Sequence, residues 1–350
     1  MTNKQKAKEL IEIIDSHFWH KGEDRPLYHY PRNQDFPEFG ELWDYAAYAM
    51  AVSSYALRSR EETAVFHMKR VLDRMELFRA DDKTARYYLS QSPDKGMKEP
   101  YYDDNAWCAL ALCFAYEAAK DMRYLLTAKE IMRYIYGGWN EKQGGIRWKE
   151  FYCDTTNACS TGGALIVSLK IYQAAGEQEY FVWAQKLYYW MRGTLRDTDG
   201  LYWDGIKTDG SIDKIKYSYN AGIMIWAGAL LYGITGHNEY LEDAKRSAQA
   251  AVKEWLPSGV FTCDCPWFCS FLIEGFIALN KHADMSGTLS AIQALLDKAQ
   301  REMRTKQGFY WRDWILHDPA NTEKHEPICH KGLYQYGVVS IITAMTEFKA

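Results

Sequence analysis

The sequence predicts an all-α fold, an (α/α)6 toroid in which six helical hairpins form one closed ring and a single domain over residues 1–350. Three features predict this fold: buried apolar helices, more polar helices between them, and glycine-rich turns that follow the polar helices. All three recur at a period of roughly 50 to 60 residues, which indicates a repeat architecture instead of separate domains. An open α-solenoid is the alternative, but six repeats without evident polar capping repeats favour a closed ring.

Runs of small and apolar residues identify the helices expected on the inside of the ring. Apolar residues surround each of these helices on nearly every side, so we expect the helices to be buried on most faces. The runs lie at residues 46–52, 109–115, 162–167 and 227–231.

The polar helices and the turns keep the same period. Each polar helix has a tyrosine four positions before an alanine, and the pairs are Tyr124 and Ala128, Tyr180 and Ala184, and Tyr240 and Ala244. The turns that follow combine glycine with aromatic residues, and they begin at Gly144, Gly200, Gly259 and Gly308.

Polar residues directly precede the inner helices. Because the inner helices of such a ring run in one direction, these residues should gather at one end, with the aromatic residues of the turns around them. Convergent polar groups in an aromatic concavity are the usual form of a ligand site. The groups are Trp43 and Asp44; Asp103, Asp104 and Asn105; Thr156 and Asn157; Tyr219 and Asn220; and, less clearly, residues 267–270 and 331–334.

Charge and hydropathy exclude several functional classes. The chain has 42 Lys and Arg against 46 Asp and Glu, a net charge of −4, whereas a nucleic-acid-binding protein would be basic. The longest uncharged apolar stretch, residues 221–236, is shorter than the ~18 residues of a membrane span, so we expect no membrane partner. Residues 1–14 lack the apolar segment of a signal peptide, and we therefore expect a cytoplasmic protein. The sequence does not indicate an oligomeric state.

No metal or other cofactor is expected. The eight cysteines are scattered and predict reduced core thiols. The one dense patch, Cys263, Cys265 and Cys269 with the distant Cys329 and His330, lacks the paired C-x2-C spacing of a zinc site. The histidines form no H-E-x-x-H motif, and the glycine pairs lack the order of a phosphate-binding loop.

Asp103 and Asp104 are adjacent carboxylates at a predicted helix start, between Tyr102 and Trp107. Helix capping would explain one of them, because aspartate is a favoured N-cap and acids suit the first turn. A second acid beside the first is harder to explain by capping alone. Both interpretations, capping and catalysis, remain open at this point.

The catalytic interpretation has a definite mechanism. Two carboxylates a few Å apart titrate as a coupled pair, so one can be ionised while the other keeps its proton. Glycoside hydrolysis needs this division between a proton donor and a carboxylate that faces the anomeric carbon. A separation of about 5 to 5.5 Å would imply a covalent glycosyl intermediate and retention of configuration.

The run Tyr102-Asp103-Asp104-Asn105-Ala106-Trp107 resembles the signature of glycoside hydrolase family 76, the α-1,6-mannanases. The resemblance covers most of residues 40–245, and the Asp-Asp-Asn-Ala-Trp core is its most specific part. The other matching segments are 43–45, 144–148, 156–157 with Ser160, 201–205, 217–222 and 230–244.

The resemblance implies an (α/α)6 toroid that cleaves α-mannosidic linkages, most specifically α-1,6 linkages in mannan-derived oligosaccharides, with retention. It implies that Asp103 is the nucleophile and that Asp104 is the general acid/base. By the resemblance, or by their place at turns and helix starts, nine residues are expected to bind the sugar. They are Trp43, Asp44, Tyr102, Trp107, Asn157, Trp203, Asp204, Tyr219 and Asn220.

The C-terminal third departs from the family pattern. A Phe-Lys-Gly-Ile-Phe-like run is expected before the fifth inner helix, but residues 265–271 read Cys-Pro-Trp-Phe-Cys-Ser-Phe. The resemblance therefore does not decide whether this segment contacts the sugar, nor which chain length and exact linkage the site prefers.

Two other functions stay open. A sugar epimerase of the same fold would need histidines at the inner-helix starts, where this chain has Asp and Asn. A carbohydrate-binding toroid without catalysis is the other possibility.

Overall fold

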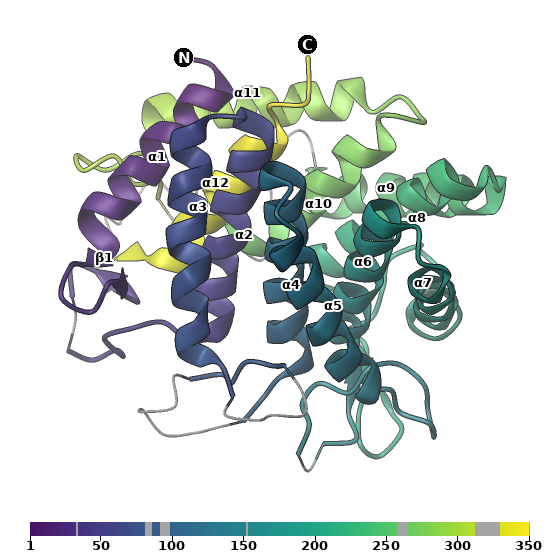
Figure 1. Ribbon diagram of the computed structural model, residues 1–350. Coiled ribbons are helices and arrows are strands. Elements are labelled where there is room, and N and C mark those ends of the chain that lie inside the picture. The colour runs from purple at the N-terminus through teal and green to yellow at the C-terminus, as the bar shows by residue number, and fades with distance from the viewer. Residues whose placement is uncertain are drawn as a thin grey trace.

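The computed structural model describes residues 1–32, 34–80, 86–91, 99–151, 153–257, 263, 265–311 and 330–349. Twelve α-helices lie within these ranges and form two concentric layers, an inner ring and an outer ring (Figure 1). The predicted all-α (α/α)6 toroid is confirmed.

The inner ring consists of every second helix. Each inner helix packs against the next, and α12 packs against both α10 and α2, so the ring is closed and the open solenoid is excluded. The inner helices are α2 (Leu42–Ser59), α4 (Tyr102–Ala119), α6 (Ala158–Ala175), α8 (Ser218–Thr235), α10 (Pro266–Leu279) and α12 (Gly332–Ala344).

The outer helices cover this ring. Helices α3, α5, α7 and α9 each pack against the inner helix that precedes them in the sequence, whereas α1 packs against α12. Both ends of the chain lie at the same end of the molecule (Figure 1). The outer helices are α1 (Asn3–Phe18), α3 (Glu62–Met75), α5 (Met122–Gly137), α7 (Gln178–Trp190), α9 (Asn238–Trp255) and α11 (Ser286–Glu302).

Small residues explain how closely the inner helices approach each other. A Cβ atom on Gly222 of α8 would lie 2.4 Å from the backbone nitrogen of Leu272 on α10. The two backbones are therefore in direct contact, which any larger side chain would prevent. This contact accounts for the small residues within the apolar runs.

The glycine-rich turns are short hairpins closed by single bridges. The bridges join Trp139 to Ile146, Arg196 to Tyr202, and Arg304 to Tyr310. Gly144, Gly200 and Gly308 have φ angles of 73°, 95° and 91°, in the left-handed region that glycine adopts without strain. The turn predicted at Gly259 lies outside the described residues.

Short strands and two short helices complete the fold. Strands β4 (Thr156–Asn157), β5 (Gly205–Ile206) and β6 (Ile212–Asp213) form one antiparallel sheet, in which Asn157 pairs with Gly205. The others are β1 (Trp19–His20) with β2 (Arg25–Pro26), β3 (His29–Tyr30) with β7 (His330–Lys331), the 3-10 helix η1 (Glu76–Phe78) and the π-helical turn η2 (Met191–Leu195).

Among the described helices, none has the length and apolar character needed to cross a membrane. In the same part of the chain, no cluster of His, Cys, Asp and Glu side chains could hold a metal ion. Cys329 of the cysteine patch lies outside the described residues.

Candidate active site

The inner helices begin at one end of the ring, and a cavity of about 480 Å³ opens there. Its walls come from the starts of α2, α4, α6, α8 and α10 and from the turns between them. The lining residues are Glu41, Trp43, Ser90, Gln91, Tyr101, Asp103, Asp104, Trp107, Trp148, Asn157, Cys159, Asp204, Tyr217, Tyr219, Trp267 and Phe268.

Asp103 and Asp104 lie together in the first turn of α4 and both line the cavity. Tyr101 is the N-cap of this helix and makes no side-chain capping bond. Neither aspartate therefore occupies the capping position, and the position of the pair favours the catalytic interpretation. The positive end of the helix dipole favours an ionised carboxylate there.

Burial shifts the titration of both acids. It raises the pKa of Asp103 to about 6, against hydrogen bonds from the Cys159 thiol, the helix-start amides and the Trp148 indole that favour the ionised form. Burial raises the pKa of Asp104 well above its usual range, and the negative charges of Asp103, Glu41 and Asp44 raise it further. Asp103 is thus the acid that ionises first, while Asp104 holds its proton.

The start of α6 brings two more polar side chains to the cavity. Asn157 is 7% exposed, and its side-chain oxygen has no hydrogen-bond partner among the described residues. Cys159 lies two positions after Asn157, in the first turn of α6, and its Sγ is 3.2 Å from Oδ2 of Asp103. An unpartnered buried acceptor on a cavity wall is suited to receive a ligand hydroxyl.

Strand pairing carries Asp204 to the same cavity. Gly205 pairs with Asn157, and a Cβ atom on Gly205 would lie 2.4 Å from the carbonyl oxygen of Thr156, so only glycine fits. Asp204 accepts hydrogen bonds from Tyr219 at 3.4 Å and from Asn220 at 3.3 Å. Burial raises the pKa of Asp204, against these two bonds.

Aromatic rings form one wall of the cavity. The Trp267 ring lies edge-on to Trp43, with centroids 6.1 Å apart, and edge-on to Trp107 at 5.6 Å. Phe268 packs beside Tyr219 at 4.4 Å. Flat apolar faces next to polar groups suit a sugar ring, which presents both C–H and O–H groups.

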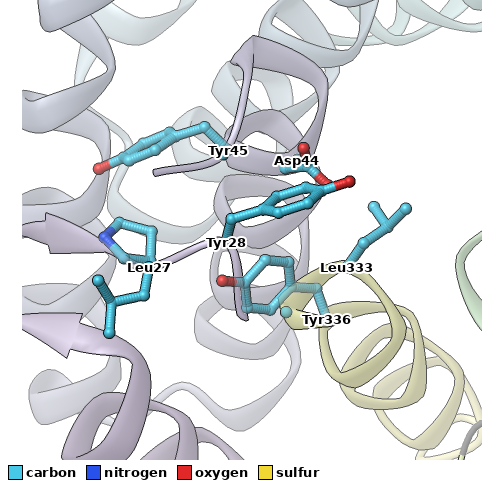
Figure 2. Close-up of a pocket in the computed structure, with 9 residues that line it drawn as sticks. Leu27, Tyr28, Asp44, Tyr45, Leu333 and Tyr336 are labelled. Atoms are coloured by element: carbon cyan, nitrogen blue, oxygen red, sulfur yellow. The ribbon is translucent and has the colours of Figure 1, made fainter. Parts of the chain in front are cut away.

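Asp44 does not line this cavity, contrary to the prediction. It is buried in a much smaller pocket with Tyr28 and Tyr336 (Figure 2). Its Oδ2 accepts the Glu41 amide at 3.3 Å as part of the capping box of α2, and Lys331 Nζ lies 3.8 Å from its Oδ1. Burial raises the pKa of Asp44 to about 7.

Three other predicted residues also lie off the cavity. Tyr102 is 3% exposed and stacks on Tyr134 with centroids 4.9 Å apart. Trp203 donates its indole N–H to Asp197 at 3.2 Å and is not among the residues that line the cavity. Asn220 is fully buried beneath Asp204 and reaches the site only through that carboxylate.

The structure adds lining residues that the sequence did not single out. Glu41 is two positions from Trp43, and Cys159 is two positions from Asn157. Closeness to these predicted residues was the signal that could have identified them. Trp267 and Phe268 belong to the segment that departs from the family pattern. They lie in the first turn of α10, and the repeat had placed residues 267–270 at this end of the ring, less clearly than the other groups.

A comparison with known families assigns the chain. The family model described as glycosyl hydrolase family 76 matches residues 2–270. The chain belongs to glycosyl hydrolase family 76. This enzyme is therefore a glycosidase, and its membership covers the aspartate pair and all the cavity walls described above.

Two curated relatives of this family 76 enzyme are fungal. The meiotically up-regulated gene 191 protein of Schizosaccharomyces pombe is 27% identical over 316 residues, 79% of this chain and 70% of that protein. The mannan endo-1,6-alpha-mannosidase DCW1 of Saccharomyces cerevisiae is 27% identical over 178 residues, 46% of this chain and 38% of that protein.

Solved structures share the fold of this family 76 enzyme. A family 76 mannosidase of Bacteroides thetaiotaomicron superposes with a TM-score of 0.86 and 24% identity over 99% of this chain and 98% of that chain. An α-1,6-mannanase of Salegentibacter, with two consecutive aspartates replaced by asparagine and α-1,6-mannotriose bound, gives a TM-score of 0.82 and 24% identity over 98% of both chains.

The fold alone would not have decided the chemistry. A sugar epimerase from a ruminal bacterium superposes with a TM-score of 0.73 at 12% identity. The match covers 98% of this chain and 100% of the epimerase chain. The family match and the acids in the cavity argue against an epimerase, since no described histidine lines the cavity.

Proposed function

We propose that this family 76 enzyme hydrolyses α-1,6-mannosidic linkages of mannan-derived oligosaccharides with retention of configuration. In this proposal Asp103 is the nucleophile and Asp104 is the general acid/base. The observation that carries it is the pair of adjacent carboxyl groups, with Asp104 buried and Asp103 half-buried, that line an aromatic cavity.

The first chemical step is a displacement at the anomeric carbon. A carboxylate oxygen of Asp103 forms a bond to this carbon while the glycosidic C–O bond breaks. The electron pair of the broken bond goes to the leaving oxygen, which takes the proton of Asp104. The products are a glycosyl ester on Asp103, a shortened oligosaccharide and an ionised Asp104.

The second step reverses these roles. Asp104 accepts a proton from water, whose oxygen attacks the anomeric carbon and displaces Asp103. Two displacements at one carbon retain its configuration. The enzyme returns to its starting protonation state, with Asp103 ionised and Asp104 protonated.

The different environments of the two acids support this assignment. Asp103 receives hydrogen bonds that favour its ionised form, whereas Asp104 faces the negative charges of Asp103, Glu41 and Asp44. A nucleophile must be ionised and a general acid must be protonated, which is the order that the surroundings favour.

The comparisons support the choice of linkage. The yeast relative is named a mannan endo-1,6-alpha-mannosidase, and the Salegentibacter mannanase variant binds α-1,6-mannotriose. That variant is described as inactive and carries its two substitutions at consecutive aspartates, as Asp103 and Asp104 are consecutive here.

The test measures hydrolysis of α-1,6-manno-oligosaccharides by the wild type, Asp103→Asn and Asp104→Asn. We expect each substitution to lower kcat by about 10³-fold or more, because each removes a group that acts in the transition state. Asp121→Asn is the matched control, since Asp121 caps α5 on the outer ring and asparagine caps equally well. Full activity in either site variant would refute the mechanism.

Two product measurements complete the test. NMR of the first product should show the α anomer, and a β anomer would exclude retention. Mannobioses with α-1,2, α-1,3 and α-1,6 linkages should be cleaved only when α-1,6-linked. Tight binding without cleavage would point to a carbohydrate-binding protein instead. The cytoplasmic location stays a prediction.

A further inference from the structure

Cys159 occupies an unusual position between two acids of the cavity. It is 7% exposed, lines the cavity and lies in the first turn of α6, the inner helix next to α4. Its Sγ is 3.2 Å from Oδ2 of Asp103. Family membership assigns no role to this thiol.

The thiol is held in place from its other side. Tyr219, on α8, lies against Cys159 and donates its hydroxyl to Asp204 at 3.4 Å. Tyr219 is 6% exposed, so bulk water competes little for these contacts. A chain of polar contacts thus runs from Asp204 through Tyr219 and Cys159 to Asp103.

A thiol in this place can act only as a hydrogen-bond donor toward Asp103. Burial and the charges of Asp103 and Asp204 raise the pKa of Cys159 well above its usual value, so sulfur keeps its proton. An S–H group is a weak donor and leaves most of the carboxylate charge available for attack. The contact therefore orients the carboxylate without neutralising it.

We propose that Cys159 is a positioning residue for the glycosidase reaction, whose thiol holds Oδ2 of Asp103 and so fixes the carboxylate toward the anomeric carbon. The inference rests on the proposed function, in which Asp103 is the nucleophile. Asn157 supports a ligand at this spot, because its unpartnered side-chain oxygen lies on the same wall and is nine-tenths buried.

Charged and titratable groups face this contact from several elements. Asp104 lies beside Asp103 on α4, while Asp204 and Tyr219 face Cys159 from the loop before β5 and from α8. Glu41 and Asp44, at the start of α2, act on Asp104. The Trp148 indole is a second donor to Asp103. A change at Cys159 alone leaves all of these groups in place.

The experiment compares the pH dependence of kcat/KM on α-1,6-mannotriose for the wild type, Cys159→Ala and Cys159→Ser. Loss of the donor in Cys159→Ala should lower kcat roughly tenfold, the size of one hydrogen bond to a charged group, with little change in KM. It should also move the acid limb to higher pH, because Asp103 then ionises less readily. Cys159→Ser keeps a hydrogen-bond donor, so its kcat and its acid limb should lie between those of the wild type and those of Cys159→Ala.

Cys113→Ala is the control, because Cys113 is a buried cysteine in the second half of α4, away from the cavity. It should leave the acid limb unchanged. An unchanged acid limb in Cys159→Ala, or a rise in KM alone, would overturn the positioning role. Asp103→Asn separates the two proposals: if that variant is inactive the proposed function stands, whatever Cys159→Ala does.

Discussion

The two ends of the inner ring both bury ionisable side chains, but the aspartate pair at one end lacks the counter-charges found at the other. At the C-terminal end of α2, Arg58 lies 2.7 Å from Glu274 and 2.8 Å from Glu347, and all three are at least two-thirds shielded from solvent. Nearby, Lys170 on α6 pairs with Glu117 on α4 at 2.9 Å. At the cavity end, no described lysine or arginine lines the cavity beside Asp103 and Asp104.

This difference separates structural charges from functional ones. A buried ion pair recovers part of the desolvation cost of its members, whereas a buried acid without a counter-charge has only hydrogen bonds to offset that cost. Such acids lower the stability of the folded chain, so their presence on a cavity floor indicates chemistry. Burial of charge without a counter-charge is therefore the more informative feature of this molecule.

The largest effect should come from breaking the paired end. Arg58→Met leaves Glu274 and Glu347 without their common partner, and we expect a loss of about 3 kcal/mol in the free energy of unfolding. Urea denaturation measures it. Arg123→Met is the control, because its pair with Asp121 at 2.6 Å is exposed and should contribute little to stability. Equal losses in the two variants would contradict the comparison.

At the cavity end, we expect removal of an ionisable side chain to raise the stability of the fold instead of lowering it. The pKa of Asp103 rises from 3.8 when unfolded to about 6 when folded, so the folded state binds the proton more tightly and loses stability as the pH rises between these values. Asp103→Asn removes this loss. The free energy of unfolding of this variant should exceed that of the wild type by on the order of 2 kcal/mol at pH 8. This gain in stability should vanish below about pH 4. Thermal or urea unfolding at both pH values tests this, and a gain independent of pH would refute it.

A smaller effect sharpens the comparison within the cavity end itself. Trp43 and Trp203 are both partly buried, but only Trp43 lines the cavity. Trp43→Leu should raise KM for manno-oligosaccharides about fivefold through the loss of one aromatic face. Trp203→Leu should leave KM unchanged. A rise in KM for Trp203→Leu alone would mean that the turn, and not the wall at α2, contacts the sugar.

The sequence predicted the ring well because its period is a property of local spacing. The runs at 46–52, 109–115, 162–167 and 227–231 all lie in inner helices. The turns at Gly144, Gly200 and Gly308 also form as predicted.

Individual site residues were harder to predict, because neighbours on a helix point about 100° apart. Trp43 faces the cavity, so Asp44 faces the small pocket beside Tyr28. Tyr219 and Asn220 divide in the same way. Sequence identified the helix start in each case, but the rotation of the helix decides which member of a pair reaches the ligand.

Contacts between distant segments were beyond sequence reasoning altogether. The bond from Cys159 to Asp103 exists because α6 packs against α4, and nothing local to either residue indicates it. Trp267 meets Trp43 only because the ring closes through α12. Family resemblance gave no expectation for Trp267, since this segment differs from the family pattern.

The pairing of α1 with α12 has a consequence for the order of folding. Helices α3, α5, α7 and α9 each pack on the inner helix directly before them in the sequence, but α1 must wait until α12 has been synthesised. Contacts between such distant segments are the slow ones to form, so ring closure should be a late event after the local hairpins. A nascent chain that lacks α12 would hold α1 as an unsatisfied amphipathic helix, a natural target for a chaperone until the ring is complete.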